Sequence, residues 1–582
     1  MARVAGGPLA VILLAASVLG VRCVPQARAA EQQAYAAAMS YTTPAISAAR
    51  GDTLRFNNLD TAGEHDIVSD GADRFASPLI GAGESALVAG VEKLDPGTYA
   101  FHCTLHSWMK GSLSVREGGD GGGQPSPDES AGDEPDGTPT PDPMTLASPV
   151  PVEPLGEGAW PVYGHDIANT RDGGQFGPSP QEALTLGPVW SHLSEDGDFT
   201  GTPVVSRGLL AIGSRGGTVV GLDPATGETL WARDLLPDAK ESEARITASA
   251  AIRGRRVYVP VNAVGRPQIA ALDRRSGKVI WRRVVDRQKR SDMYGSPQVW
   301  QGRVFVGTSG YFGEQVTGVE TSARGSVTAL SARTGKRLWK TYTVPPGHDG
   351  GAVWSTPSID PERRRVYIGT GNAYHPPAGP MTDSMVALSA RRGRVVDYFQ
   401  ATAGDVWNGV EDSLQSPDAD FGSSPNLFTL ADGREVVGQG QKSGVYWALD
   451  RQTMEPVWTS LTGPGSFQGG IIGSTAVDGA RVYGANAITG QVWAVGHQGV
   501  PAWTSSDGFP LRYNAVSVAR DVVYATDFGG FLTAREANTG VPLAKLSLGA
   551  PSWAGVAVAG GSVFTATGSA TGSGWVVAYR PR

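Results

Sequence analysis

Apolar and polar positions repeat as one unit through the second part of the chain. An apolar strand ends in a Thr-Gly or Ser-Gly turn and a Trp follows on the next strand, as in residues 221–231, 271–281 and 329–339. Weaker copies start at Ala387, Ala448, Ala494, Ala534 and Ala578. Successive starts are 40 to 61 residues apart, the length of four short strands. We therefore predict an all-β fold with an eight-bladed β-propeller over residues 158–582.

The two ends of the repeat predict how the propeller closes. The last unit, residues 575–579, reaches the C-terminus without its outer strand, whereas residues 187–191 precede the first full unit. We expect these two segments to pair in the last blade, because closure removes exposed sheet edges.

A smaller folding unit precedes the repeats. Its apolar residues alternate with polar ones in residues 98–101 and 112–115, and turn signals occur at residues 50–52 and 95–97. Alternation of this kind is typical of strands with one buried face. We predict a small antiparallel β-sandwich over residues 30–116.

Residues 117–157 separate these two units. They contain ten acidic residues, no Lys or Arg, and many Gly and Pro. With little apolar surface to bury, such a segment is predicted to be a disordered linker. The chain has a net charge of -7, so the remainder sums to about +3. No basic patch indicates a nucleic-acid partner.

The N-terminus has the pattern of an export signal. Arg3 is followed by an apolar run over residues 9–21 and by Ala27-Arg28-Ala29. We predict a signal peptide over residues 1–29 and a secreted protein, periplasmic or extracellular. No later apolar run is long enough to span a membrane. Of the two cysteines, only Cys103 would then remain, so it cannot form an internal disulfide.

Cys103 lies in a segment that carries metal-ligand residues. His106 and Met109 follow it at intervals of three residues, and His65 follows an earlier strand-like segment. A thiolate, two imidazoles and a weak thioether form the ligand set of a type 1 electron-transfer copper. The alternative is an ordinary buried cysteine with an unrelated Met and His.

This region, about residues 35–116, resembles the cupredoxins, with the ligand spacing of amicyanin. The resemblance implies that His65, Cys103, His106 and Met109 bind copper. Asp66 stands where such proteins commonly have Asn. His102, beside Cys103, is expected to face outward, because no His-x-His pair occurs that could complete a second copper site.

Residues 158–582 carry a second set of motifs, most of them in predicted loops and strand starts. They include residues 160–171, 351–357, 369–372, 404–408, 421–425 and 440–444. These motifs resemble quinoprotein dehydrogenases, which bind pyrroloquinoline quinone (PQQ) in an eight-bladed propeller, and look most like polyvinyl-alcohol dehydrogenase. The resemblance covers nearly all of the second unit.

The resemblance implies roles for individual residues. Trp354 matches the residue that stacks on the quinone, and Lys442 the cation that hydrogen-bonds it. Glu314 and Asn372 match the oxygen ligands of a calcium. At the position of the catalytic base, this sequence differs from the family. Asn408 stands where relatives have an aspartate and cannot accept a proton, so Asp405 or Asp383 would have to serve. The adjacent cysteines that cover the quinone in relatives are missing from residues 320–325.

Two functions remain open at this point. In the first, a secreted quinoprotein alcohol dehydrogenase oxidises an alcohol, which could be polymeric, and passes electrons to its own copper domain and then to a redox partner protein. The linker, largely extended at about 3 Å per residue, would let the copper domain reach the propeller. In the second, a cofactor-free propeller is a binding scaffold tethered to a copper electron carrier.

Overall fold

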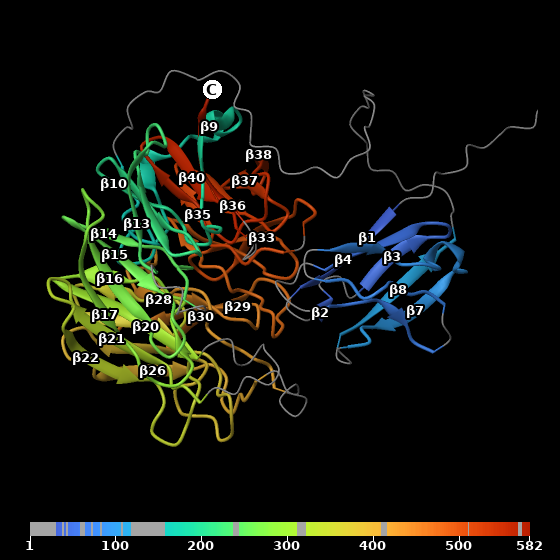
Figure 1. Cartoon of the computed structure of the whole chain (residues 1–582). Coiled ribbons are helices and arrows are strands. Elements are labelled where there is room, and N and C mark those ends of the chain that lie inside the picture. Colours follow the sequence, from blue (N-terminus) through green and yellow to red (C-terminus); the bar gives the residue numbers. More distant parts are fainter. Residues whose placement is uncertain are drawn as a thin grey trace, which may run out of the picture. The chain divides into compact units, whose positions relative to one another are not determined.

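The computed structural model describes residues 31–37, 40–41, 45–58, 64–71, 74–81, 84–105, 109–117, 158–236, 244–310, 322–408, 416–509, 511–568 and 573–582. The chain divides into two compact units, the first with strands β1–β8 and the second with β9–β41 (Figure 1). The predicted signal peptide and, apart from Glu117, the predicted linker lie outside the described residues. No helix in the described ranges is long and apolar enough to cross a membrane.

The first unit contains two four-stranded sheets, in the orders β2-β1-β4-β6 and β3-β8-β7-β5. The elements are β1 (Glu31–Ala37), β2 (Ser40–Tyr41), β3 (Ala45–Ala49), β4 (Thr53–Asn58), β5 (Val68–Ser69), β6 (Ser85–Leu87), the 3-10 helix η1 (Val91–Lys93), β7 (Gly97–His102) and β8 (Lys110–Arg116). The side chains of Leu54, Phe56, Phe101 and Leu113 are fully buried in one shared core.

The predicted antiparallel sandwich is wrong in one respect. Strand β1 pairs with β4, and β3 pairs with β8, in parallel. The chain crosses from one sheet to the other between β1 and β4, so these neighbours run in the same direction. Alternation of buried and exposed residues reports which face of a strand is buried, and it carries no information on strand direction.

The second unit has a β-propeller-type fold, in which consecutive sheets follow the chain (Figure 1). The first four sheets consist of β10 (Val204–Ser206), β11 (Leu209–Gly213), β12 (Thr218–Leu222) and β13 (Thr229–Asp234); β14 (Ala251–Arg253), β15 (Arg256–Val261), β16 (Gln268–Asp273) and β17 (Val279–Val284); β18 (Ser291–Asp292), β19 (Gln298–Trp300), β20 (Arg303–Gly310), β21 (Ser326–Ser331) and β22 (Arg337–Tyr342); and β23 (Ser358–Asp360), β24 (Arg365–Gly369), β25 (Ser384–Ser389) and β26 (Val395–Gln400).

The remaining sheets complete the unit. They consist of β27 (Asn426–Thr429), β28 (Glu435–Gly440), β29 (Val445–Asp450) and β30 (Pro456–Leu461); β31 (Ala476–Val477), β32 (Arg481–Ala485), β33 (Val492–Gly496) and β34 (Pro501–Ser505); β35 (Ser517–Ala519), β36 (Val522–Thr526), β37 (Phe531–Glu536) and β38 (Pro542–Ser547); and β39 (Ala557–Ala559), β40 (Ser562–Ala566), β41 (Trp575–Pro581) and β9 (Leu186–Leu193). Two short helices precede the first sheet, η2 (Gly174–Phe176) and α1 (Pro180–Ala183).

Two sets of contacts close the unit on itself. Strand β9 pairs with β41 along its length, which confirms the predicted pairing of residues 187–191 with the C-terminal segment. The first strands of consecutive sheets also touch, from β10 to β14 and onward to β39, and β39 in turn contacts β10. The first strands therefore surround a common axis.

The repeat starts in the sequence have a structural cause. In each sheet the register between the last two strands shifts by a bulge, and the shifts follow Gly221, Ala271, Ala329, Ala387, Ala448, Ala494, Ala534 and Ala578. Small residues are needed there because a Trp lies opposite in most sheets, as Trp281 does opposite Ala271. The Trp also packs on the turn glycine of the next sheet, where a Cβ on Gly335 would lie 2.6 Å from Cε3 of Trp281. The Trp therefore fills the space between neighbouring sheets.

Candidate functional site

A buried lysine in the second unit is paired with two carboxylates. Lys442 lies in the turn after β28, and its Nζ is 2.8 Å from both carboxylate oxygens of Asp418 and 3.1 Å from Oδ2 of Asp420. The side chains of Lys442 and of both aspartates are at most 4% exposed. Charges are buried in this way only when they are paired, because removing them from water is costly.

Asp383 is a third buried carboxylate in this region. It lies just before β25 in a left-handed backbone conformation, with φ of 46°, and its side chain is fully buried. Neither of its carboxylate oxygens has a hydrogen-bond partner within the described part of the chain. Burial raises the pKa of Asp383 well above its usual range, and the nearby carboxylates of Asp420, Asp405 and Asp418 raise it further.

Asp405, the other candidate for the base, and Asn408 are both engaged in hydrogen bonds. The carboxylate of Asp405 accepts from the hydroxyl of Ser416 at 2.5 Å, from N of Ala419 at 2.7 Å and from N of Asp418. Asn408 donates its side-chain amide to O of Tyr374 at 3.0 Å. Both residues therefore hold loops together, whereas Asp383 keeps an unpaired carboxylate.

Asn372 lies on the same loop as Asp383. Its backbone N–H donates to Oδ1 of Asp420 at 2.7 Å, and its side-chain amide nitrogen donates to O of Trp407 at 2.6 Å. These bonds fix the amide plane and connect Asn372 to the Lys442 pairs through Asp420. Glu314, the other predicted calcium ligand, lies outside the described residues.

The indole ring of Trp354 lies close to Lys442. It follows β22 and lies before β23, and Nζ of Lys442 is 5.9 Å from its ring centroid. The ring lies directly against Gly422, where a Cβ would be 2.1 Å from Cη2 of Trp354. Gly422 thus makes room for the ring, and Trp354, Lys442 and the carboxylates meet although they come from different loops.

In the first unit, the predicted copper ligands that the structure describes also converge. His65, Cys103 and Met109 are buried, and Nδ1 of His65 lies 3.8 Å from Sγ of Cys103. The backbone N–H of Cys103 donates to O of Met109 at 3.1 Å, which folds the loop back on itself. His106 lies outside the described residues.

Asp66 and His102 lie beside this group, and both make side-chain hydrogen bonds. Asp66 accepts from the backbone N–H of Thr104 at 2.7 Å and from its hydroxyl at 2.6 Å, so the aspartate braces the loop that carries Cys103. His102 points away from the core and lies 2.5 Å from Oδ1 of Asp70, as expected for an outward-facing residue.

Comparison with known proteins identifies the second unit. Residues 160–462 match the family model described as "Glucose/ethanol/alcohol dehydrogenase, beta-propeller domain". The chain belongs to this PQQ β-propeller family. Polyvinylalcohol dehydrogenase of Pseudomonas sp. is 27% identical over 92% of this chain and 89% of its own length, and that of Sphingopyxis sp. is 28% identical over 75% and 76%. Quinohemoprotein alcohol dehydrogenase from Comamonas testosteroni shares the fold, with a TM-score of 0.61 and 20% identity over 72% of this chain and 80% of its own.

The geometry fits the cofactors of a PQQ propeller in part. A buried carboxylate with no partner among the described residues, a buried lysine and a half-buried indole lie near one another, and together they suit a planar ring that carries polar groups. Among the described residues, no three His, Cys, Asp or Glu side chains are close enough to hold a metal ion by themselves. A calcium here would need amide oxygens or residues outside the described ranges.

Our sequence analysis missed two aspartates and one aspartate–histidine pair near the PQQ motifs. Asp418 and Asp420 directly precede the motif at residues 421–425, and this acidic pair was a visible signal. The third is a pair in which Nδ1 of His375 lies 2.5 Å from Oδ2 of Asp349. Oδ1 of Asp349 accepts from the backbone N–H of His375 at 3.0 Å. No local pattern marks that pair, because its members lie in separate loops.

A ring of hydroxyl groups below Trp354 was also missed. In each sheet, one residue two positions before the first strand faces the axis, and in six sheets it is Ser or Thr: Thr202, Ser249, Ser296, Thr356, Ser424 and Ser474. We call these six residues the hydroxyl ring. Their backbone N–H groups donate in turn to the next hydroxyl, from Ser249 to Ser474, at 2.9 to 3.0 Å. A Ser or Thr followed by Pro recurs before four of these strands, at residues 202–203, 296–297, 356–357 and 424–425, and was the available signal.

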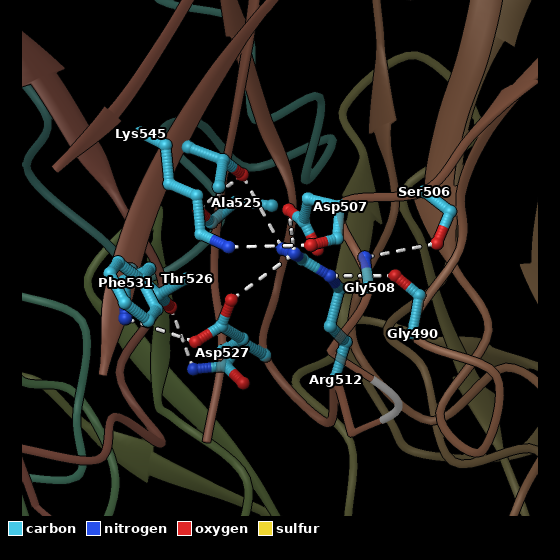
Figure 2. Close-up of polar contacts among 12 residues, drawn as sticks. Gly490, Ser506, Asp507, Gly508, Arg512, Ala525, Thr526, Asp527, Phe531 and Lys545 are labelled. Atoms are coloured by element: carbon cyan, nitrogen blue, oxygen red, sulfur yellow. Dashed lines mark hydrogen bonds and ion pairs between the residues drawn. The ribbon is translucent and has the colours of Figure 1, made fainter. Parts of the chain in front are cut away.

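A buried ion-pair network adjoins Tyr513, one of the residues that face the axis. Figure 2 shows the guanidinium of Arg512 between the carboxylates of Asp507 and Asp527. Nη2 of Arg512 is 3.2 Å from Oδ2 of Asp527, and its Nε donates to O of Gly490 at 2.7 Å. Arg512 and Asp527 are fully buried. Because breaking a buried pair costs about 3–5 kcal/mol, this network fixes the position of the next residue, Tyr513.

Proposed function

We propose that the chain is a secreted, PQQ-dependent alcohol dehydrogenase whose propeller oxidises an alcohol and whose N-terminal unit accepts the electrons at a type 1 copper. The observation that carries the proposal is the meeting of Trp354, Lys442 and the unpaired carboxylate of Asp383 in a chain of this family. PQQ, when bound, supplies the two-electron oxidation of the alcohol.

The residues of the chain have separate roles in this proposal. Trp354 supports the planar ring from one side, and the Gly422 contact holds the indole in place. Lys442 is held by Asp418 and Asp420 and donates hydrogen bonds to the ring's oxygens. Asp383 accepts the alcohol proton, because a carboxyl with a raised pKa is a stronger base than an exposed carboxylate.

The charges around Lys442 favour a cation as well. Asp383, Asp418 and Asp420 lie near a single buried ammonium group. A calcium bound by Asn372 and Glu314 would offset the surplus negative charge, since Ca²⁺ prefers carboxylate and amide oxygens. We infer that Asp405 and Asn408 position this loop.

We infer further that the sheets of the second unit form an eight-bladed propeller. This is supported by the contacts between first strands that lead from β10 to β39 and back to β10. The substrate class follows from the relatives, two of which are named polyvinylalcohol dehydrogenases. We therefore propose an alcohol substrate that can be a polymer with many hydroxyl groups.

The N-terminal unit is proposed to be a cupredoxin that binds one type 1 copper. The buried Cys103, His65 and Met109, together with the brace from Asp66, support it. A copper with this ligand set supplies one-electron transfer. His106 would be the fourth ligand. Residues 1–29 would direct export, residues 117–157 would tether the two units, and a separate redox protein would receive the electrons.

Reconstitution tests the proposal. Purified protein treated with PQQ and Ca²⁺ should gain quinone absorbance and oxidise alcohols with an artificial dye as acceptor. Trp354→Ala should lose most of the quinone binding, whereas Trp493→Phe, a buried Trp away from the site, should keep it. Copper loading should give a blue absorption band that Cys103→Ser abolishes. Absence of quinone uptake by the wild type would leave the scaffold hypothesis in its place.

A further inference from the structure

Positive charge is concentrated on the turns of three neighbouring sheets of the second unit, those that run from β14 to β26. In each sheet one such turn joins the first and second strands and another joins the third and fourth, counted from β19 in the sheet of β18–β22. The six turns contain 16 Lys and Arg residues and three Asp and Glu residues, and they are residues 253–256, 273–278, 301–303, 331–337, 360–365 and 389–394. We call this set the basic turns.

The same turns of the other sheets have the opposite balance. They contain five Lys and Arg residues and nine Asp and Glu residues, over residues 206–209, 223–228, 429–435, 450–455, 477–481, 496–500, 519–522, 536–541 and 559–562. The excess of cations is therefore a property of three sheets and is not required by the fold.

The basic turns form one continuous face. Within each sheet a backbone hydrogen bond joins the two turns: N of Arg274 donates to O of Arg255 at 3.0 Å, N of Ala332 to O of Gly302 at 2.8 Å, and N of Ala390 to O of Arg364 at 2.9 Å. Side chains join neighbouring sheets, since Nη1 of Arg256 donates to O of Ala332 at 2.5 Å and Nε1 of Trp339 donates to O of Ala390 at 3.1 Å. We call this surface the basic face.

The charge of the basic face is not neutralised by its own acidic residues. Eleven of its 16 cationic residues are exposed, whereas Glu362 is its one exposed acidic residue. Asp360 is buried and paired with Arg363, and Asp273 accepts from the backbone N–H of Ser276 in its own turn. A single-sign field of this size attracts a partner of opposite charge.

The chain itself contains a segment of opposite charge. Residues 117–157 carry ten Asp and Glu residues and no Lys or Arg. When extended, these 41 residues can span up to about 135 Å. Single exposed ion pairs are weak, but a tethered segment meets its own chain at a local concentration on the order of millimolar, so even weak docking is populated.

The acidic segment joins the second unit at the end of the axis where the basic face lies. A Cβ on Gly158 would be 3.1 Å from N of Gly560, in the turn between β39 and β40. The residue two positions before each first strand lines the same hollow on the axis, so all first strands run in the same direction. The turn at Gly560 and the basic turns therefore lie at the same end.

We propose that residues 117–157 dock on the basic face, and that rising ionic strength releases them. Docking there leaves the opposite ends of the sheets uncovered. Lys442 of the candidate quinone site lies at such an end, because it is in the turn between the second and third strands β28 and β29.

Zero-length crosslinking tests the proposal on the full chain, without PQQ, calcium or copper. A carbodiimide joins a carboxylate directly to an amine, so docking is read at Lys278 and Lys336, the exposed lysines of the basic face. Lys545, exposed on β38 of another sheet, is the reference amine. An equal mixture of ¹⁵N-labelled and unlabelled chains distinguishes links within a chain from links between chains by mass spectrometry.

We expect links within the chain from residues 117–157 to Lys278 and Lys336, about tenfold more frequent than to Lys545 at about 20 mM salt. They should fall about tenfold at 1 M salt, where the Debye length drops from about 20 Å to about 3 Å. Replacing two exposed arginines of the face, Arg391→Gln with Arg392→Gln, should lower them about threefold or more.

The matched control is Arg287→Gln with Lys289→Gln, which removes the same charge from exposed residues between β17 and β18, at the other end of the sheet. It should leave the links unchanged, and circular dichroism checks that each variant is folded. Links that ignore salt, or that both pairs of substitutions reduce equally, would overturn the proposal. Links only between chains would assign the face to a second copy and overturn it. Absence of links, with tight binding of added heparin, would assign the face to an external polyanion and overturn it too.

Discussion

Gly422 determines whether Trp354 can lie where it does, and Gly422→Ala tests this directly. A Cβ at this position would be 2.1 Å from Cη2, 2.5 Å from Cζ2 and 3.0 Å from Cζ3 of Trp354. Carbon atoms in contact are normally about 3.5–4.0 Å apart, so the ring or the backbone must move by about 1.5 Å. The backbone of Gly422 is not in the left-handed region, so the clash is the only source of strain.

The expected magnitude follows from this overlap. Forcing one extra carbon into a packed site costs about 1–3 kcal/mol, which we expect as a loss in the free energy of unfolding of the propeller unit. If the indole tilts away to relieve the clash, it no longer supports the quinone, and the Kd for PQQ should rise by about 5- to 150-fold for the same energy. Urea unfolding and PQQ titration measure the two effects separately.

A control and a second variant make this prediction refutable. A Cβ on Gly479 would meet nothing within 4 Å, so Gly479→Ala should be neutral or stabilising by about 0.4–1 kcal/mol. In a Trp354→Ala background, Gly422→Ala should cost almost nothing, because its collision partner is gone. If Gly422→Ala matches Gly479→Ala in wild-type protein, or costs the same with and without Trp354, the proposed packing is wrong.

Three further results are expected. Lys442→Met should lower the free energy of unfolding by about 3–5 kcal/mol, because it strips the buried carboxylate of Asp418 of its charge partner; adding Asp418→Asn should recover part of the loss in urea titrations. Asp383→Asn should stabilise metal-free protein more at pH 8 than at pH 5. The pKa of Asp383 is raised in the folded protein, so wild-type stability falls as the pH rises above 3.8, the ordinary pKa of an aspartate. Equal shifts in melting temperature at both pH values would contradict this. Ser424→Ala should cost about 1–3 kcal/mol by leaving the backbone N–H of Thr356 unpaired, and an unchanged urea midpoint would rule out that bond.

The sequence was sufficient wherever the structural cause is local or periodic. Most bulges place a small residue opposite a Trp, and most of the turns place a glycine against the Trp of the preceding sheet, so these requirements recur in the chain at a similar offset. Closure by residues 187–191 followed from a missing strand in the last unit. Cys103 and Met109 lie on one short loop, so their spacing predicted that they would lie close together.

The tertiary structure alone decided which residues act together at the axis. Asp383 and Lys442 are far apart in the chain, and their proximity depends on how consecutive sheets pack around the axis. The alternation of apolar and polar residues shows which face of a strand is buried but not the direction of the strand. For this reason the sequence did not predict the parallel strand pairs of the first unit. Whether a carboxylate is paired also depends on its neighbours in space. Asp405 accepts hydrogen bonds from residues 416–419, whereas the carboxylate of Asp383 has no hydrogen-bond partner among the described residues and has a raised pKa. The sequence thus determined the repeating scaffold, because its bulges and turns depend on residues close in the chain. Only the packing of the sheets around the axis decided the electrostatics of the site.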